Sequence, residues 1–238
     1  MSLLRLLFYV KSGPVSLDVL IATTGGAQES RVVGGTHRIS ERMAEDLRDG
    51  VQLGAFVTSI GQTDDGFVVG YDGRIAARHV IVAAPQPLAG RIRYTQPLPS
   101  SRDALLQQIP VGAVIKYNIG YPTPFWRERG LTGFVLSRHH EFIVVLGNSP
   151  RDGSCGVLVG FLEGAHTCGA AELTPEQRSE ILLDDLVEYF GEQAAEPFDK
   201  LEQDWMAEEF TRGCYGGRLG AGCGPSTARH SPITRRVN

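Results

Sequence analysis

The sequence is poor in cysteine, and its cysteines form no recognisable pattern. Four cysteines occur in 238 residues, and no two of them have Cys-x-x-Cys spacing. The pair His139-His140 has no third ligand at metal spacing, so we expect it to be solvated and predict no metal site. Neither a structural zinc site nor a disulfide framework is indicated. Because a reducing compartment is the default for such a chain, we expect a cytoplasmic location.

The sequence also lacks an excess of positive charge and any long apolar run. Its net charge of −4 and pI near 5.9 give no general footprint for nucleic acid or an anionic membrane. The apolar stretch at residues 2–10 is interrupted by Arg5, and no later run approaches the roughly 18 apolar residues of a membrane helix. We predict an amphipathic core helix over residues 2–10, no membrane segment, and a globular protein with small-molecule partners.

The first third of the chain combines glycine pairs with helix-like and strand-like patterns. The pairs Gly25-Gly26 and Gly34-Gly35 mark tight turns or close approaches of the backbone. Apolar residues recur every four positions over residues 36–47, which predicts a helix ending before Gly50. The next segment predicts a β-meander, followed by a strand buried on both faces and ended by Pro85. These strands are expected at 56–60, 67–71, 74–76 and 79–83.

The middle of the chain predicts an antiparallel sheet covered by a helix. A short helix is expected at 102–108, and strands at 111–121, 134–136, 142–146 and 156–162. Thr174, Pro175 and Gln177 form a capping box with proline at the first helical position, so a helix should run to Phe190. Its apolar stripe should pack on the sheet.

The end of the chain has no periodic pattern. No acidic residue follows Glu209, whereas arginine, glycine, serine and proline accumulate. We therefore expect residues 220–238 to be irregular and poorly packed.

Lys116 stands inside an otherwise apolar, strand-like run at residues 111–121. A buried ammonium group costs several kcal/mol unless it finds a partner, so this lysine needs an explanation. One alternative is a structural edge-strand lysine whose head reaches water. The other alternative is a lysine that handles protons or holds a water molecule in a site.

Several segments, taken in order, resemble the flavin-containing monoamine oxidases. They are Gly-Gly-Ala-Gln-Glu-Ser-Arg-Val-Val-Gly-Gly at 25–35, Val-Ile-Val-Ala-Ala-Pro at 80–85, Val-Ile-Lys at 114–116, Pro-Phe-Trp-Arg at 124–127, Asp-Trp at 204–205 and Gly-Cys-Tyr-Gly at 213–216. Each segment alone is a weak signal, but their collinearity over residues 3–217 is specific.

The resemblance implies a fold class and a domain arrangement. The class is α/β (α+β mixed), in which part of a Rossmann-like FAD-binding domain is interleaved with a substrate domain built on a mixed or antiparallel sheet. Residues 1–28 are expected in a helical part of the substrate domain and 29–85 in the FAD-binding domain. Residues 86–209 are expected in the substrate domain, and 210–238 in a remnant of the FAD-binding domain with an irregular tail.

The resemblance also implies which residues contact the flavin. Lys116 matches a catalytic lysine that holds a water molecule against flavin N5. Trp205 matches a tryptophan stacked near the flavin ring, and Cys214 matches a flavin contact whose covalent bond is left open. Val57 lies in the strand that would bind the adenine side through its backbone. Packing roles remain the structural alternative for Val57 and Trp205.

Three further positions are implied on the amine side of the site. Tyr215 matches a catalytic aromatic that forms one wall of a cage around the amine, where an aromatic face attracts a cation. Gln28 matches a glutamine that lines the amine cavity, and Ile21 matches a residue of the cavity wall. A backbone-bonding loop glutamine and a core isoleucine are the alternatives for the last two.

The implied activity is the FAD-dependent oxidation of an amine by oxygen to an aldehyde, ammonia and hydrogen peroxide. Two pieces of the family pattern are missing, namely the N-terminal G-x-G-x-x-G unit and the C-terminal flavin segment. We therefore expect a fragment that is inactive or binds FAD poorly. The alternatives are a polyamine oxidase, an amino-acid oxidase or a desaturase of the same fold, or a non-catalytic remnant or interaction module. A homodimer is left open.

Overall fold

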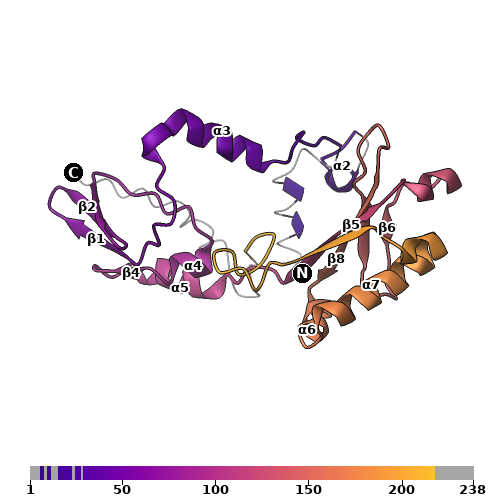
Figure 1. Cartoon of the computed structure of the whole chain (residues 1–238). Helices are drawn as coiled ribbons and strands as arrows, with labels where there is room; N and C mark the ends of the chain where they lie inside the picture. Colours follow the sequence, from indigo (N-terminus) through magenta and orange to yellow (C-terminus); the bar gives the residue numbers. More distant parts are fainter. Residues whose placement is uncertain (1–5, 8–9, 12–15, 23–24, 28, 218–238) are drawn as a thin grey trace. The chain divides into compact units, whose positions relative to one another are not determined.

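A computed structural model of the protein describes residues 6–7, 10–11, 16–22, 25–27 and 29–217 (Figure 1). These residues fall into two compact units. Unit 1 contains the described residues up to Val82 together with those from Gly90 to Gln108. Unit 2 contains Ala83–Ala89 and the residues from Ile109 to 217. Most of the helix expected at 2–10 and the whole tail expected at 220–238 lie outside the described residues.

Unit 1 contains a four-stranded mixed sheet in the order β3-β2-β1-β4. The strands β1 (Ser59–Thr63), β2 (Gly66–Gly70) and β3 (Arg74–Ala77) form the predicted antiparallel meander. The short strand β4 (Arg93–Tyr94) runs parallel to β1. Strand β1 begins later than expected because its partner β2 ends at Gly70, which pairs with Ser59. Residues 56–57 therefore have no cross-strand neighbour in β2.

The prediction of a buried strand at 79–83 is wrong. These residues have no regular secondary structure, and the Ile81 side chain is 92% exposed. A strand that is apolar on both faces forms only where neighbouring strands pair with it and other elements cover it. No strand within the described residues pairs with this run. It leads instead into the short helix α4 (Gln86–Ala89) of unit 2.

The helices of unit 1 follow their local sequence signals. α2 (Leu17–Ile21) has Ser16 as its N-cap, and α3 (His37–Leu47) forms where the four-residue apolar spacing predicts it. A 3-10 turn, η1 (Arg48–Gly50), ends α3. α5 (Ser100–Gln108) buries Leu105 and Leu106, whereas α3 has no buried residue. The apolar stripe of α3 is therefore exposed.

Unit 2 is built on a five-stranded antiparallel sheet in the order β6-β7-β8-β5-β9. Its strands are β5 (Val114–Tyr121), β6 (Val135–Leu136), β7 (Val144–Gly147), β8 (Gly156–Glu163) and β9 (Asp199–Asp204). The antiparallel arrangement and the first four of these strands confirm the prediction. Strand β9 has no signal in the sequence, because Asp-Lys-Leu-Glu-Gln-Asp has no apolar alternation. This strand pairs along the edge of β5 and needs no buried face of its own.

Helix α7 (Pro175–Phe190) covers one face of this sheet (Figure 1). The predicted capping box is present: Thr174 Oγ1 accepts the Gln177 N–H, and Gln177 Oε1 accepts the Thr174 N–H. The main core joins the α7 side chains to the alternate positions of β5 that face the helix. These core residues are Ile115, Tyr117, Ile119, Tyr121, Leu182, Leu186 and Phe190. Alternation places the intervening β5 residues, Lys116 among them, on the opposite face of the sheet.

Smaller elements close the edges of this core. The 3-10 helix η2 (Phe125–Arg129) buries Phe125 and Trp126, and η3 (Glu192–Ala195) buries Ala194. The short helix α6 (Ala165–Ala170) lies between β8 and α7 in the sequence.

A buried arginine ties α7 to the far edge of the sheet. The Arg178 side chain donates to the Glu202 carboxylate on β9 through Nε and Nη2, and the Tyr117 hydroxyl donates to the same carboxylate. Arg178 also donates to the Ala170 and Leu173 carbonyl oxygens. Breaking such a pair by removing one partner typically costs about 3–5 kcal/mol, because the other charge is left buried. This network therefore holds the edge strand β9 in place.

Helices combined with a mixed and an antiparallel sheet confirm the predicted α/β (α+β mixed) class. The first change of unit, between Val82 and Ala83, lies close to the change of domain expected at Pro85. Residues 90–108, however, belong to unit 1. The assignment of the units to an FAD-binding and a substrate domain stays a prediction.

Candidate functional site

The face of the unit 2 sheet that lies opposite α7 carries both apolar and charged side chains. Val114 and Lys116 of β5 alternate with the core residues, and in β8 the corresponding positions are Val159, Phe161 and Glu163. The antiparallel register pairs Lys116 with Phe161 and Val114 with Glu163. An ammonium and a carboxylate group therefore stand on one face beside an aromatic ring.

The segment after β9 crosses to the same face. Trp205 donates its backbone N–H to the Val114 carbonyl oxygen at 3.3 Å, and its side chain packs against the Val114 cluster. The Asp204 carboxylate accepts the Met206 and Ala207 N–H groups at 2.9 and 3.2 Å, which makes a turn directly after the strand. The β5–β9 strand pair thus leads into a loop that continues towards residue 214.

Cys214 and Tyr215 are held against the start of β5 by backbone pairing. The Cys214 N–H donates to the Gly112 carbonyl oxygen at 2.8 Å, and the Gly112 N–H donates to Gly216 at 3.3 Å. Gly213 has a φ of +139°, and a Cβ there would lie 2.5 Å from the Gly112 carbonyl oxygen. Only glycine fits this close approach, which explains the first glycine of the Gly-Cys-Tyr-Gly pattern.

Tyr215 presents its ring outward and is anchored by its hydroxyl group. The residue is 68% exposed, and its hydroxyl donates to Glu163 Oε1 at 3.0 Å. Its ring centroid lies 6.1 Å from that of Phe161. Desolvation, followed by the Glu163 carboxylate, raises the pKa of Tyr215. The side chain is therefore a neutral phenol at neutral pH, with a ring free to meet a ligand.

Cys214 is a half-buried free thiol that responds to both neighbouring charges. Burial raises the pKa of Cys214 above its ordinary value, the Lys116 ammonium group opposes that change, and the Glu163 carboxylate adds to it. Such coupling requires that Lys116, Cys214 and Glu163 lie near one another. Cys214 is thus a protonated thiol at neutral pH.

The structure brings together four of the seven predicted site residues. Lys116, Trp205, Cys214 and Tyr215 meet on this face of unit 2. Lys116 faces the side on which Trp205 and Tyr215 lie, as expected, while the functional roles stay predictions.

The other three predicted residues are not part of this cluster. Ile21 is the last residue of α2 in unit 1, and Gln28 lies outside the described residues. Val57 does not lie in a strand, which corrects the prediction: it precedes β1 and is half-buried. Pairing reaches only Thr58, whose N–H donates to Gly70 and whose carbonyl oxygen accepts the Arg93 N–H.

Sequence reasoning missed Glu163 and Phe161. The only signal was a carboxylate at the end of the apolar run Gly-Val-Leu-Val-Gly-Phe-Leu-Glu. That run alternates in a way that puts Phe161 and Glu163 on one face, but their nearness to Tyr215 depends on how β8 and the 213–217 segment each pair with the start of β5. No local pattern encodes that pairing.

The remaining sequence expectations concern metals and membranes. His140 is not solvated as expected: its side chain is 21% exposed and faces Asp185 at 3.5 Å and Glu188 at 3.3 Å. Within the ranges that the structure describes, no group of histidine, cysteine and acidic residues could hold a metal ion. In those same ranges no helix is long and apolar enough to cross a membrane.

The residues of this face fit the edge of a flat aromatic cofactor. Tyr215 supplies an exposed ring and Trp205 a partly exposed one. Val114 and Phe161 are 3% and 8% exposed and form one apolar cluster with Trp205 and Cys214. A neutral isoalloxazine ring is a chemically suitable partner for such a surface, because its faces are apolar and its nitrogens accept hydrogen bonds. These residues therefore suit the isoalloxazine ring of FAD.

Comparisons with known proteins point in the same direction. The family described as "Flavin containing amine oxidoreductase" matches residues 12–223. The chain is 35% identical over 201 residues to a probable flavin-containing monoamine oxidase A of Dictyostelium discoideum, covering 83% of this chain and 44% of that protein. It is 34% identical over 219 residues to the flavin-containing amine oxidase B of Sus scrofa, covering 90% of this chain and 42% of that protein.

Solved structures show the same likeness. Cyclohexylamine oxidase from Brevibacterium oxydans IH-35A superposes with a TM-score of 0.86 at 31% identity, covering 93% of this chain and 49% of that chain. A putrescine oxidase with a redesigned cofactor site superposes with a TM-score of 0.76 at 39% identity, covering 79% of this chain and 42% of the other. The chain spans less than half the length of each of these relatives. The family match covers most of the chain, which therefore belongs to the flavin-containing amine oxidoreductase family.

Proposed function

We propose that this protein takes part in the FAD-dependent oxidation of amines, converting an amine, oxygen and water into an aldehyde, ammonia and hydrogen peroxide. The observation that carries the proposal is the gathering of Lys116, Trp205, Cys214 and Tyr215 on one sheet face. FAD, when bound, accepts the two electrons and passes them to oxygen. The protein's own residues bind and orient the amine and keep water away.

Each residue of the face has a task that follows from its position. The exposed Tyr215 ring, anchored by Glu163, offers a π-face against which an amine is oriented. Val114, Phe161 and Trp205 keep the surface apolar, so that charge interactions there are strong. Lys116 supplies an ammonium donor that can hold one water molecule at the edge of the site.

The charges on the face narrow the class of substrate. The Glu163 carboxylate accepts the Tyr215 hydroxyl hydrogen, so a substrate carboxylate next to Tyr215 would be repelled. We therefore favour amines without a carboxylate over amino acids. The names of the relatives, monoamine oxidase, putrescine oxidase and cyclohexylamine oxidase, support simple monoamines, diamines and cyclic amines as the first substrates to test.

A non-catalytic role is the second candidate, and the exposed apolar stripe of α3 favours it. None of the residues of α3 is buried, which is unusual for a helix with such strong apolar spacing. A chain that serves as an interaction module would keep the unit 2 sheet without oxidising amines.

Purification of the 238-residue chain with added FAD separates the two candidates. Because the sequence pattern predicts weak FAD binding, FAD is added in excess. Amine oxidation by this chain then predicts a bound flavin spectrum and peroxide release with benzylamine, putrescine or cyclohexylamine. Replacement of Tyr215 by alanine should lower that release, whereas Tyr71→Ala in the turn between β2 and β3 of unit 1 should not. A colourless chain that releases no peroxide with any of the three amines would contradict the proposal and favour the interaction module.

We also propose a cytoplasmic location, which rests on the cysteine pattern alone. A homodimer is a further proposal, about the oligomeric state. Cell fractionation tests the first, and sedimentation equilibrium tests the second.

A further inference from the structure

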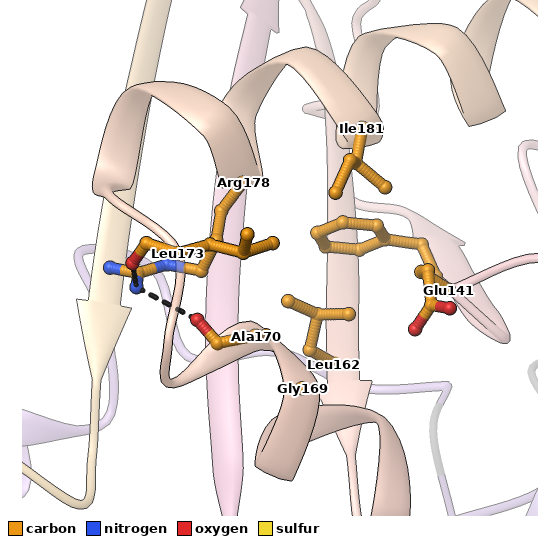
Figure 2. Close-up of a pocket in the computed structure, with 8 residues that line it drawn as sticks. Glu141, Leu162, Gly169, Ala170, Leu173, Arg178 and Ile181 are labelled. Carbon is orange, nitrogen blue, oxygen red and sulfur yellow. Dashed lines mark hydrogen bonds between the residues drawn. The ribbon is translucent and has the colours of Figure 1, made fainter.

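A pocket of unit 2 lies on the helix-covered face of the sheet, opposite the face that carries Lys116. It has a volume of about 240 Å³ and opens between α6, α7 and β8 (Figure 2). Its walls include Phe142, Leu162, Leu173 and Ile181. Leu162 and Phe161 are adjacent in β8 and point to opposite faces, so the sheet separates this pocket from the candidate amine-oxidation site.

The one positive group in the wall has no free hydrogen-bonding role. Arg178 Nη1 donates to the Ala170 and Leu173 carbonyl oxygens at 3.2 and 2.7 Å, and Nε and Nη2 donate to the Glu202 carboxylate. Figure 2 shows its guanidinium group turned towards the Ala170 carbonyl. An anionic ligand would therefore find a cation that is already neutralised by a carboxylate.

The negative group at the rim is open to a ligand. The Glu141 side chain is 53% exposed, and its carboxylate meets only the His166 ring, at 2.9 Å, among the contacts within the described residues. His166 belongs to α6 and is itself 37% exposed. A cation at the mouth of the pocket can reach Glu141 without entering the apolar interior.

We infer that this pocket is a binding site for a small amine that carries one aromatic or aliphatic ring. The ring rests against Leu173 and Ile181, the partly exposed apolar side chains of the wall, because Phe142 and Leu162 are 0% and 1% exposed. The ammonium group meets Glu141. An apolar cavity of about 150 Å³ is enough to hold benzene, so the volume here admits a ring with a short aminoalkyl chain. The site goes beyond the proposed oxidation and does not depend on it.

Calorimetric titration of the whole chain, without FAD, tests the site with three probes of one shape. We expect saturable binding of benzylamine, weaker binding of benzyl alcohol and none of benzoate. Glu141→Gln should weaken benzylamine about two- to fivefold, the effect of one exposed charge pair, and leave benzyl alcohol unchanged. Glu188→Gln, at an exposed carboxylate of α7 outside the pocket, is the matched control and should change neither.

Two variants fill the pocket by different routes. A Cβ at Gly169 of α6 meets no atom within 4 Å, so Gly169→Leu is accommodated and favours the helix. Ile181→Trp enlarges the opposite wall. Each should weaken benzylamine binding about tenfold or more, the loss of roughly one ring contact.

Tyr215→Ala distinguishes benzylamine binding in this pocket from binding at the candidate oxidation site on the other face of the sheet. It alters the candidate oxidation site alone, so benzylamine binding to the pocket should be unchanged. The inference is overturned if the unaltered chain shows no saturable benzylamine binding, if both filling variants bind as the unaltered chain does, or if Tyr215→Ala abolishes binding. A chain that binds benzylamine here and yet releases no peroxide would contradict the proposed function alone.

Discussion

Lys116 and Glu163 place opposite charges on one face of the unit 2 sheet, and the Cys214 thiol lies close enough to respond to both. Neither residue has an ion-pair partner among the salt bridges of the described residues. Glu163 is held by the Tyr215 hydroxyl group, whereas Lys116 stands on this half-buried face without an ion-pair partner among the described residues. The pKa of Cys214 therefore reports the electrostatic effect of both charges.

We predict opposite effects of Lys116→Met and Glu163→Gln on Cys214. Removal of the ammonium group raises the pKa of Cys214 further, and removal of the carboxylate lowers it. Alkylation of the thiol near neutral pH should therefore slow in the first variant and accelerate in the second, because the thiolate is the nucleophile. The rates are measured with iodoacetamide in a chain whose other three cysteines are replaced by serine. If the alkylation rate changed in the same direction in both variants, the opposing effects of Lys116 and Glu163 on Cys214 would be refuted.

Lys116→Met should also slow the flavin chemistry of an FAD-loaded protein while leaving the fold intact. Methionine keeps the length of the side chain but cannot hold a water molecule through an ammonium group. Loss of general acid–base help typically costs about 10²–10⁴ in rate. Stopped-flow measurement of flavin reduction and of reoxidation by oxygen checks each half-reaction.

Lys200→Met is the matched control for that experiment. Lys200 lies on β9 of the same sheet but faces α7, where its ammonium group donates to the Ser179 hydroxyl. It should leave both half-reactions unchanged. Equal rates for Lys116→Met and the unaltered protein would leave Lys116 with a structural role only.

At the scale of elements, α7 joins local signals to long-range packing. Its start is set by the capping box at Thr174, and its buried stripe meets the alternate residues of β5. Asp185, in the middle of the helix, accepts the Phe142 N–H at 2.9 Å and faces His140. The helix therefore fixes both the sheet and the loop that carries Glu141.

We expect Thr174→Ala to lower the free energy of unfolding by about 1 kcal/mol. The alanine leaves the Gln177 N–H without its side-chain acceptor, whereas the backbone N–H of residue 174 can still donate to Gln177 Oε1. Urea denaturation followed by circular dichroism measures the change. Thr174→Ser keeps the cap and should be close to neutral, so an equal loss in both variants would point away from capping.

The raised pKa of Asp185 should make the free energy of unfolding depend on pH. Burial raises the pKa of Asp185, while the Phe142 N–H and His140 oppose the change, and Glu141 and Glu188 add to it. A carboxyl group with a raised pKa in the folded state binds protons more tightly when folded. Stability is then present below the unfolded pKa and is lost as pH rises through the folded pKa, from about pH 4 upward.

Asp185→Asn keeps an acceptor for the Phe142 N–H but cannot titrate. Its free energy of unfolding should therefore fall less than that of the unaltered chain as pH rises through this window. Thermal unfolding at a series of pH values compares the two, with Glu180→Gln, at an exposed carboxylate of the same helix, as control. A difference between the profiles that grows in the opposite direction would show that Asp185 is held ionised.

At the scale of the molecule, unit 1 and unit 2 differ in how they bury their apolar residues. Unit 2 has a core of helix on sheet, whereas α3 of unit 1 exposes Ile39, Met43 and Leu47 by 54%, 60% and 61%. A contiguous apolar stripe of this kind promotes association with other surfaces.

Replacement of Ile39, Met43 and Leu47 together by glutamine should barely change stability, because each exposed substitution is typically worth within about 0.5 kcal/mol. It should reduce self-association, measured by light scattering over a range of concentrations. Leu105→Gln in α5, at a residue that is 4% exposed, is the contrasting control and should cost several kcal/mol. A large loss of stability in the triple variant would mean that the α3 stripe is covered.

The sequence by itself determined the elements whose signals are local. The capping box places the start of α7, the apolar spacing places α3, and alternation identifies β5. The order of the motifs was enough to indicate the family, because collinear segments carry information that no single motif has. These features need no partner elsewhere in the chain.

Only the tertiary structure decided which residues meet. The register between β5 and β8, together with the pairing of 213–217 against the start of β5, places Glu163 beside Tyr215, and edge pairing makes a strand of the polar β9. The run at 79–83 looks like a buried strand but has no partner within the described residues, so it stays irregular. Strand pairing and burial depend on neighbours distant in the sequence, and local periodicity does not contain them.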